Sequence, residues 1–161
     1  MQREDFDLGA ELAALSAGRS DIGALVSFTG LVRDAGGAGG GLEALELEHY
    51  PGMTEKALAG IEAEARGRWP LQACLIVHRF GRMVPGEQIM MVATASPHRE
   101  AAFAAAEFLM DYLKSRAPFW KKETGRGGGR WVEARGADEA ALARWDGDGA
   151  ERRQQGDVNP A

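Results

Sequence analysis

The order of the predicted elements constrains the fold of this chain most strongly. Hydrophobic periodicity and turn residues predict helices at 9–19, 54–69, 97–117 and 138–145, and strands at 22–32, 42–50, 71–80, 88–95 and 131–135. Strands therefore follow one another in pairs, without the regular strand–helix–strand alternation that builds a parallel sheet. We predict an α+β fold with a mainly antiparallel sheet and flanking helices.

The third predicted helix has the clearest boundaries. Ser96 is a typical N-cap and Pro97 suits a first turn, whereas Pro118 disfavours helical backbone at the residue before it. The apolar side chains that we expect to face the core are Phe103, Ala106, Met110 and Leu113. In the preceding helix, Thr54 is the expected N-cap.

Length and composition indicate one globular domain. We expect a single catalytic domain over residues 1–145, because a chain of this size can bury its own core. Residues 146–161 are polar and glycine-containing, with almost no apolar side chains, so we expect a disordered C-terminal tail.

The chain has no feature of an exported or membrane-inserted protein. Its apolar runs are far shorter than the roughly 20 residues that cross a bilayer, and its N-terminal residues are polar and acidic. The one cysteine, Cys74, excludes an internal disulfide and lies between apolar residues, where we expect an inert core thiol. We therefore expect a cytoplasmic protein.

Positive charge gathers in one segment of an otherwise acidic chain. Between Lys114 and Arg135 there are seven Lys or Arg residues and two Glu residues, whereas the whole chain carries a net charge of −5. Lys114 and Lys121 lie on either side of Pro118, beside the aromatic Phe119. This segment predicts a pocket for an anionic ligand. Lysines held close together shift toward the neutral amine, which can act as an acid, a base or a nucleophile.

Three further side chains are candidates for anion binding. His98 and Arg99 belong to the first turn of the predicted helix, where free N–H groups and the helix dipole attract an anion. The alternative is that they are ordinary exposed residues. Arg33 ends a predicted strand and opens the glycine-rich loop 34–41, which either folds over a ligand or is surface slack. Because this loop precedes a strand, it is not a P-loop.

Four motifs resemble the large, catalytic subunit of molybdopterin synthase. They are S-F-T-G-L-V-R at 27–33, L-E-H-Y-P-G-M-T-E-K at 47–56, S-P-H-R at 96–99 and M-D-Y-L-K-S-R-A-P-F-W-K-K-E at 110–123. They occur in the order of that family, and the resemblance extends from residue 20 to residue 145. It departs at the C-terminal tail and in the glycine content of the loop 34–41.

The resemblance implies an α/β hammerhead fold and a sulfurtransferase activity. Members of this family convert cyclic pyranopterin monophosphate into molybdopterin by installing two sulfurs as a dithiolene. The sulfur donor is a thiocarboxylate at the C-terminus of a small ubiquitin-like partner. The family forms a homodimer with one small subunit at each end, which makes a heterotetramer. We accordingly expect no cofactor and no metal.

The resemblance also implies the site residues. The expected catalytic residues are Lys114 and Lys121. The expected substrate-binding residues are Arg33, His98, Arg99, Lys122 and Glu123. In this reading His98 and Arg99 are supplied across the dimer, and Lys122 and Glu123 flank the site.

Two other classes of function compete with this one. A nucleic-acid binder would use Phe119, Trp120 and Trp131 as stacking platforms. The acidic net charge and the small size of the basic segment argue against it. A non-catalytic module that binds an anion or a pterin through the same residues stays open, because residue spacing cannot distinguish binding from turnover.

Overall fold

The computed structural model describes residues 1–34, 41–125, 128–132 and 142–145 of the chain. Its elements are α1 (Leu8–Ser16), β1 (Ala24–Leu31), β2 (Leu42–His49), α2 (Met53–Arg68), β3 (Ala73–His78), β4 (Gly81–Met83), β5 (Gln88–Ser96), α3 (Arg99–Ser115), β6 (Phe119–Gly125) and β7 (Gly128–Val132). The ladders between these strands are antiparallel, which confirms the predicted α+β class.

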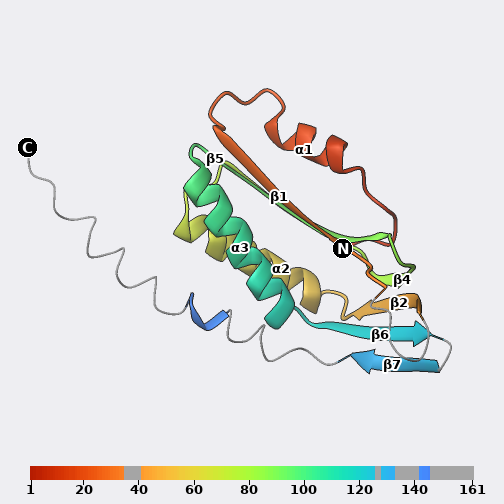
Figure 1. Cartoon of the computed structure of the whole chain (residues 1–161). Helices are drawn as coiled ribbons and strands as arrows, with labels where there is room; N and C mark the ends of the chain where they lie inside the picture. Colours follow the sequence, from red (N-terminus) through yellow and green to blue (C-terminus); the bar gives the residue numbers. More distant parts are fainter. Residues whose placement is uncertain (35–40, 126–127, 133–141, 146–161) are drawn as a thin grey trace, which may run out of the picture.

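The first sheet has the strand order β1-β5-β3 and is covered on both faces. Helix α1 lies over one face, and α2 and α3 lie over the other (Figure 1). The alternation of side chains along the central strand β5 fits this arrangement. Met91 and Ala93 pack with Phe6 on the α1 side, whereas Met90 and Val92 join the larger core beneath α3.

The larger core forms where α2 and α3 meet. Phe108 of α3 is fully buried, and its ring contacts the rings of Trp69 and Trp145 edge-on, at 5.3 and 5.5 Å between centroids. The buried stripe of α3 consists of Ala102, Ala105, Ala106, Phe108, Leu109 and Leu113. The prediction that Phe103 faces the core is wrong, since its side chain is 61% exposed. Small alanines occupy the inward positions of the first turns, and Phe103 lies beside that stripe.

The second sheet has the order β4-β2-β6-β7 and lies at one end of the first (Figure 1). Val32, Leu45, Leu47 and Met83 form its buried cluster. Two of its strands were not predicted, β4 within the connection 81–86 and β6 directly after Pro118. Polar side chains on both faces of β6 hide its period, and β6 is defined by pairing with β2 and β7.

Two expected helix caps are also wrong. Ser96 is the last residue of β5, paired with Ala24, and His98 is the N-cap of α3. The N-cap of α2 is Gly52, whose N–H donates to the Glu55 carboxylate at 2.6 Å. The hydroxyl of Thr54 instead accepts from the N–H of Tyr50 at 3.2 Å. In both cases the hydroxyl also donates to a distant carbonyl oxygen, Ser96 to Pro70 at 3.1 Å and Thr54 to Pro118 at 3.4 Å, contacts that the local sequence pattern does not reveal.

The C-terminal part of the prediction is only partly described. Of the predicted helix 138–145, residues 142–145 are described, and Leu142 and Trp145 pack into the larger core. The indole N–H of Trp145 donates to Asp111 at 2.7 Å. Several other predictions fall on positions outside the described residues, namely 35–40, 133–135, 138–141 and the tail 146–161. Among the helices of the described part, none is long and apolar enough to cross a membrane.

Phe108 and Phe103 form a matched pair for testing this core. Phe108→Ala removes a fully buried ring, so we expect the free energy of unfolding to fall by about 3–5 kcal/mol. Phe103→Ala, on the same helix, should change it by only about 0.5 kcal/mol. Urea unfolding of both variants measures the difference. Equal losses would contradict the burial described here.

Candidate active site

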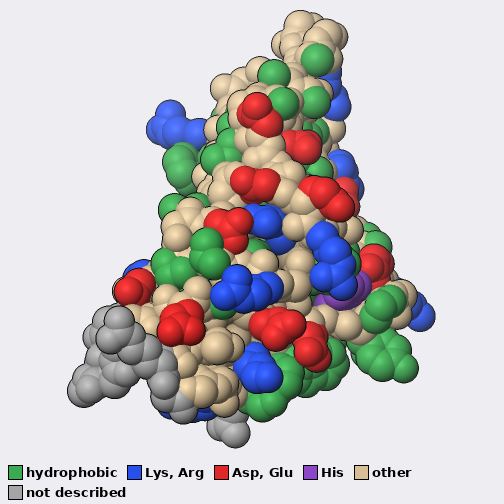
Figure 2. Space-filling model, turned by 90° about the vertical axis from the view of Figure 1, so that its right-hand side faces the viewer, with side chains coloured by type: hydrophobic (Ala, Val, Ile, Leu, Met, Phe, Trp, Pro, Cys, Tyr) green, Lys and Arg blue, Asp and Glu red, His purple; other side chains and the backbone are tan. Residues whose placement is uncertain are grey.

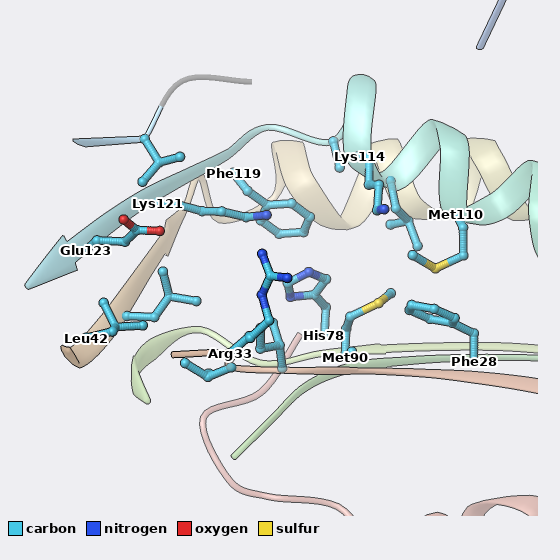
Figure 3. Close-up of a pocket in the computed structure, with 17 residues that line it drawn as sticks. Phe28, Arg33, Leu42, His78, Met90, Met110, Lys114, Phe119, Lys121 and Glu123 are labelled. Carbon is cyan, nitrogen blue, oxygen red and sulfur yellow. The ribbon is translucent and has the colours of Figure 1, made fainter. Parts of the chain in front are cut away.

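A pocket of about 410 Å³ opens between the two sheets, beneath the C-terminal end of α3 (Figure 3). Its size is that of a small-molecule site. The apolar side chains that line it include Phe28, Met90, Met110, Leu113 and Phe119. The charged side chains that line it are Arg33, Lys114, Lys121 and Glu123. The pocket therefore offers an apolar surface for a ring and cations for an anionic group.

Helix α3 and the end of β1 each contribute one cation. Lys114 belongs to the last turn of α3, one turn after Met110, and both side chains point into the pocket (Figure 3). Arg33 follows β1, where Val32 exchanges backbone hydrogen bonds of 2.8 Å with Gly86 and Glu87. The stem of the loop is closed by the N–H of Leu42, which donates to the Asp34 carboxylate at 2.9 Å. These bonds hold the backbone beside Arg33.

Strand β6 contributes the second lysine through its alternation. Successive side chains of a strand point to opposite faces, so Phe119, Lys121 and Glu123 share the face that lines the pocket. Lys122 is on the other face, where its Nζ lies 5.7 Å from the ring centroid of Trp131. The structure thus brings Lys114, Lys121, Arg33 and Glu123 together and places Lys122 on the opposite face of β6.

The other two predicted residues lie at the far end of α3. His98 and Arg99 are exposed at its N-terminus. Helix rise places Arg99 roughly 22 Å from Lys114 along the helix axis. Within one copy of the chain, these two side chains do not reach the pocket.

His78 is a pocket residue that the sequence did not identify. Its imidazole is 5% exposed, lines the pocket and stacks on Phe119, with 4.1 Å between the ring centroids. The available signal was the alternation of side chains along β3. Ile76 packs into the larger core and Val77 packs on the α1 side, so His78 shares the inward face of Ile76. A polar residue on that inward face was the sign of a site.

The buried position of His78 keeps its imidazole neutral. Burial lowers the pKa of His78 to about 4, and the positive charge of Lys121 acts in the same direction. Its Nδ1–H donates to the carbonyl oxygen of Arg79 at 2.9 Å, which opposes part of this shift. The pocket thus combines one guanidinium and two lysine side chains with one carboxylate and one neutral imidazole.

The described residues show neither a cluster of metal-ligating side chains nor a reactive thiol at the pocket. Within the described ranges, no group of three His, Cys, Asp or Glu side chains is arranged to hold a metal ion. Burial raises the pKa of the Cys74 thiol to about 12. The thiol packs against the larger core, as expected for an inert residue. The arrangement suits anion binding, charge stabilisation and proton transfer by lysine.

Comparisons with known proteins agree on one family. The family model described as MoaE protein matches residues 1–116. The molybdopterin synthase catalytic subunit of Cereibacter sphaeroides is 63% identical over 145 residues, which covers 90% of this chain and 97% of that protein.

Two solved structures support the same grouping. The molybdopterin biosynthesis MoaE protein of Burkholderia ambifaria is 60% identical, with a TM-score of 0.77 over 90% of this chain and 95% of that chain. Molybdopterin synthase of Staphylococcus aureus is 34% identical, with a TM-score of 0.75 over 81% and 93%. The fold expected from the motif resemblance is thereby confirmed.

The pKa of His78 predicts a pH dependence of stability. Unfolded His78 binds a proton near pH 6.5, whereas the folded imidazole binds one only near pH 4. Its contribution is therefore complete above pH 6.5 and is lost as pH falls toward 4, by up to about 3 kcal/mol. His78→Gln should flatten this part of the curve, measured by urea unfolding between pH 4 and 7. Identical slopes for the two proteins would refute it.

Proposed function

The chain belongs to the MoaE protein family, and on that premise we propose that it is the catalytic subunit of a molybdopterin synthase. In this function it takes sulfur from the thiocarboxylated C-terminus of a small ubiquitin-like partner. It transfers that sulfur to cyclic pyranopterin monophosphate, and two transfers form the dithiolene of molybdopterin. The observation that carries the proposal is that Lys114, Lys121 and Arg33 meet in one apolar-lined pocket.

The two lysines suit the charges that this reaction creates. In each transfer the thiocarboxylate sulfur forms a bond to the pterin, and water then cleaves the acyl–sulfur bond and leaves a carboxylate on the partner. Nearby ammonium groups stabilise the oxyanionic intermediates of this cleavage. We assign Lys114 to the incoming tail of the partner, since it stands at the exposed end of α3. We assign Lys121 to acid–base or charge-stabilising work at the pterin, since it shares its strand face with Phe119.

The substrate phosphate is assigned to Arg33 together with His98 and Arg99 of a second copy. The distance along α3 supports this division, because one copy cannot bring both ends of the helix to one pocket. A second copy would also cover apolar side chains that are exposed in a single copy. Leu25, Phe28 and Leu31 on the edge strand β1 are 37%, 42% and 55% exposed. Unpaired edge strands with exposed apolar side chains favour association.

The assembly that we propose is a homodimer of this chain with one small partner at each end, located in the cytoplasm. Residues 1–145 form the catalytic domain, and the tail 146–161 is not required for turnover. Nucleic acid is not a partner in this proposal. Figure 2 shows acidic and basic side chains interspersed on the face that it displays, rather than the single-sign groove that tracks a nucleic-acid backbone.

Lys114→Ala and Lys121→Ala should each lower turnover by about 100-fold or more, because each removes a group that stabilises charge or transfers a proton. Product formation by each purified variant, with the thiocarboxylated partner and the cyclic pterin, measures the loss. Lys122→Ala is the matched control and should stay near wild type, since Lys122 is on the opposite face of β6. Normal turnover by both lysine variants at unchanged melting temperature would refute the assignment of Lys114 and Lys121 as catalytic residues.

The shared site can be tested by mixing variants. In a heterodimer of Arg99→Ala and Lys114→Ala chains, one of the two sites keeps both residues. Random mixing of two inactive variants should therefore restore about one quarter of wild-type activity. Lys114→Ala mixed with Lys121→Ala is the control and should restore none, because both lysines line the pocket of one copy. Absence of rescue in the first mixture, with heterodimers shown to form, would show that Arg99 is not supplied across the dimer.

A further inference from the structure

We propose that His78 binds the substrate as a neutral hydrogen-bond acceptor, its Nε2 taking a hydrogen bond from an N–H group of the pterin ring. The inference rests on the proposed function and assigns a residue that the motifs do not include. It concerns the ring of the substrate, whereas Arg33, His98 and Arg99 concern its phosphate.

The hydrogen bond of Nδ1 fixes which nitrogen faces the ligand. The partner of Nδ1 is the carbonyl oxygen of Arg79, at 2.9 Å, and a carbonyl oxygen only accepts. The proton of the neutral ring is therefore on Nδ1, and Nε2 keeps its lone pair. Arg79 is itself buried and donates to the carbonyl oxygens of Gln88, at 2.8 Å, and Arg3, at 3.2 Å. The backbone that orients the imidazole is thus anchored from two other segments.

Packing fixes the plane of the ring. His78 and Phe119 stack with an angle of 23° between their planes, and His78 is directly opposite Met90 in the β3–β5 ladder. Figure 3 shows the imidazole beneath Phe119 and beside Met90 at the floor of the pocket. An acceptor with a fixed position and direction discriminates between ligands better than a mobile side chain does.

The surrounding charges keep this acceptor unprotonated. The charged or titratable groups that face His78 are Lys121 on β6, His49 on β2 and the amino group of Met1, and each of them lowers its pKa, as does burial. Among the charged side chains that line the pocket, Arg33, Lys114 and Lys121 donate hydrogen bonds when charged, and Glu123 carries a negative charge. His78 differs from them as a neutral acceptor. It suits the uncharged pyrimidine part of the pterin, whose amide and amino N–H groups need acceptors.

Three substitutions separate this role from simple packing. His78→Gln keeps a polar atom near the position of Nε2 but loses the stack. His78→Phe keeps the stack but has no acceptor. His78→Asn keeps a donor near Nδ1 and has no atom at the Nε2 position, so it replaces the Phe variant if that one does not fold. Melting temperatures at pH 8 verify that each variant is folded.

Binding of cyclic pyranopterin monophosphate is measured by calorimetry, and turnover is measured separately. We expect the Phe and Asn variants to bind about tenfold more weakly and to show a raised KM with kcat within about threefold of wild type. The Gln variant should recover most of the affinity. The pH dependence of kcat between 5.5 and 8 should be the same for wild type and His78→Gln, because a neutral acceptor does not titrate there.

Two results would overturn the inference while leaving the proposed function intact. One is binding by the Phe variant as tight as that of wild type, which would reduce His78 to packing. The other is an ionisation that disappears from the pH profile of His78→Gln, which would make His78 a titrating base. Binding by wild type without turnover would instead refute the proposed function, and the binding comparison would still decide the role of His78. Absence of any binding by wild type would overturn both.

Discussion

The site depends on one piece of strand pairing, the antiparallel ladder between β2 and β6. Pro118 separates α3 from a new strand, and β6 runs along β2 with Phe119 opposite His49 and Lys121 opposite Leu47. Lys114 and Lys121 are seven residues apart in the sequence, and without this ladder nothing would direct both side chains to the same side of the molecule. With it, both lysines line one pocket. The hydroxyl of Thr54 donates to the carbonyl of Pro118 at 3.4 Å and ties the turn to α2.

The pocket combines an apolar interior with cations at its exposed margin. Met90, Leu113 and Phe119 belong to the hydrophobic clusters of the fold, so the same packing that stabilises the chain shapes the cavity. Lys114, Lys121 and Arg33 are exposed. A charged substrate can therefore be held at the margin while its ring contacts the interior. His78, buried and neutral, belongs to the interior although it is polar.

The sequence predicted what depends on local pattern and on motif. The α+β class, most helices and strands, and the grouping of Lys114 with Lys121 followed from periodicity, charge and resemblance. It did not predict β6, because charged side chains on both faces conceal a strand that its partners define. It placed Phe103 in the core, where alanines suffice. His78 was missed because its one signal, a polar residue on the inward face of β3, does not reveal the tertiary contact with Phe119.

Reconstitution of the reaction tests the central claim most directly. The purified chain is mixed with a small partner that carries a C-terminal thiocarboxylate and with cyclic pyranopterin monophosphate, and the pterin products are resolved by mass in a single turnover. The account predicts a product that has gained two sulfurs, together with partner protein whose thiocarboxylate has become a carboxylate. A pterin that stays bound without gaining sulfur, while the partner keeps its thiocarboxylate, would contradict it.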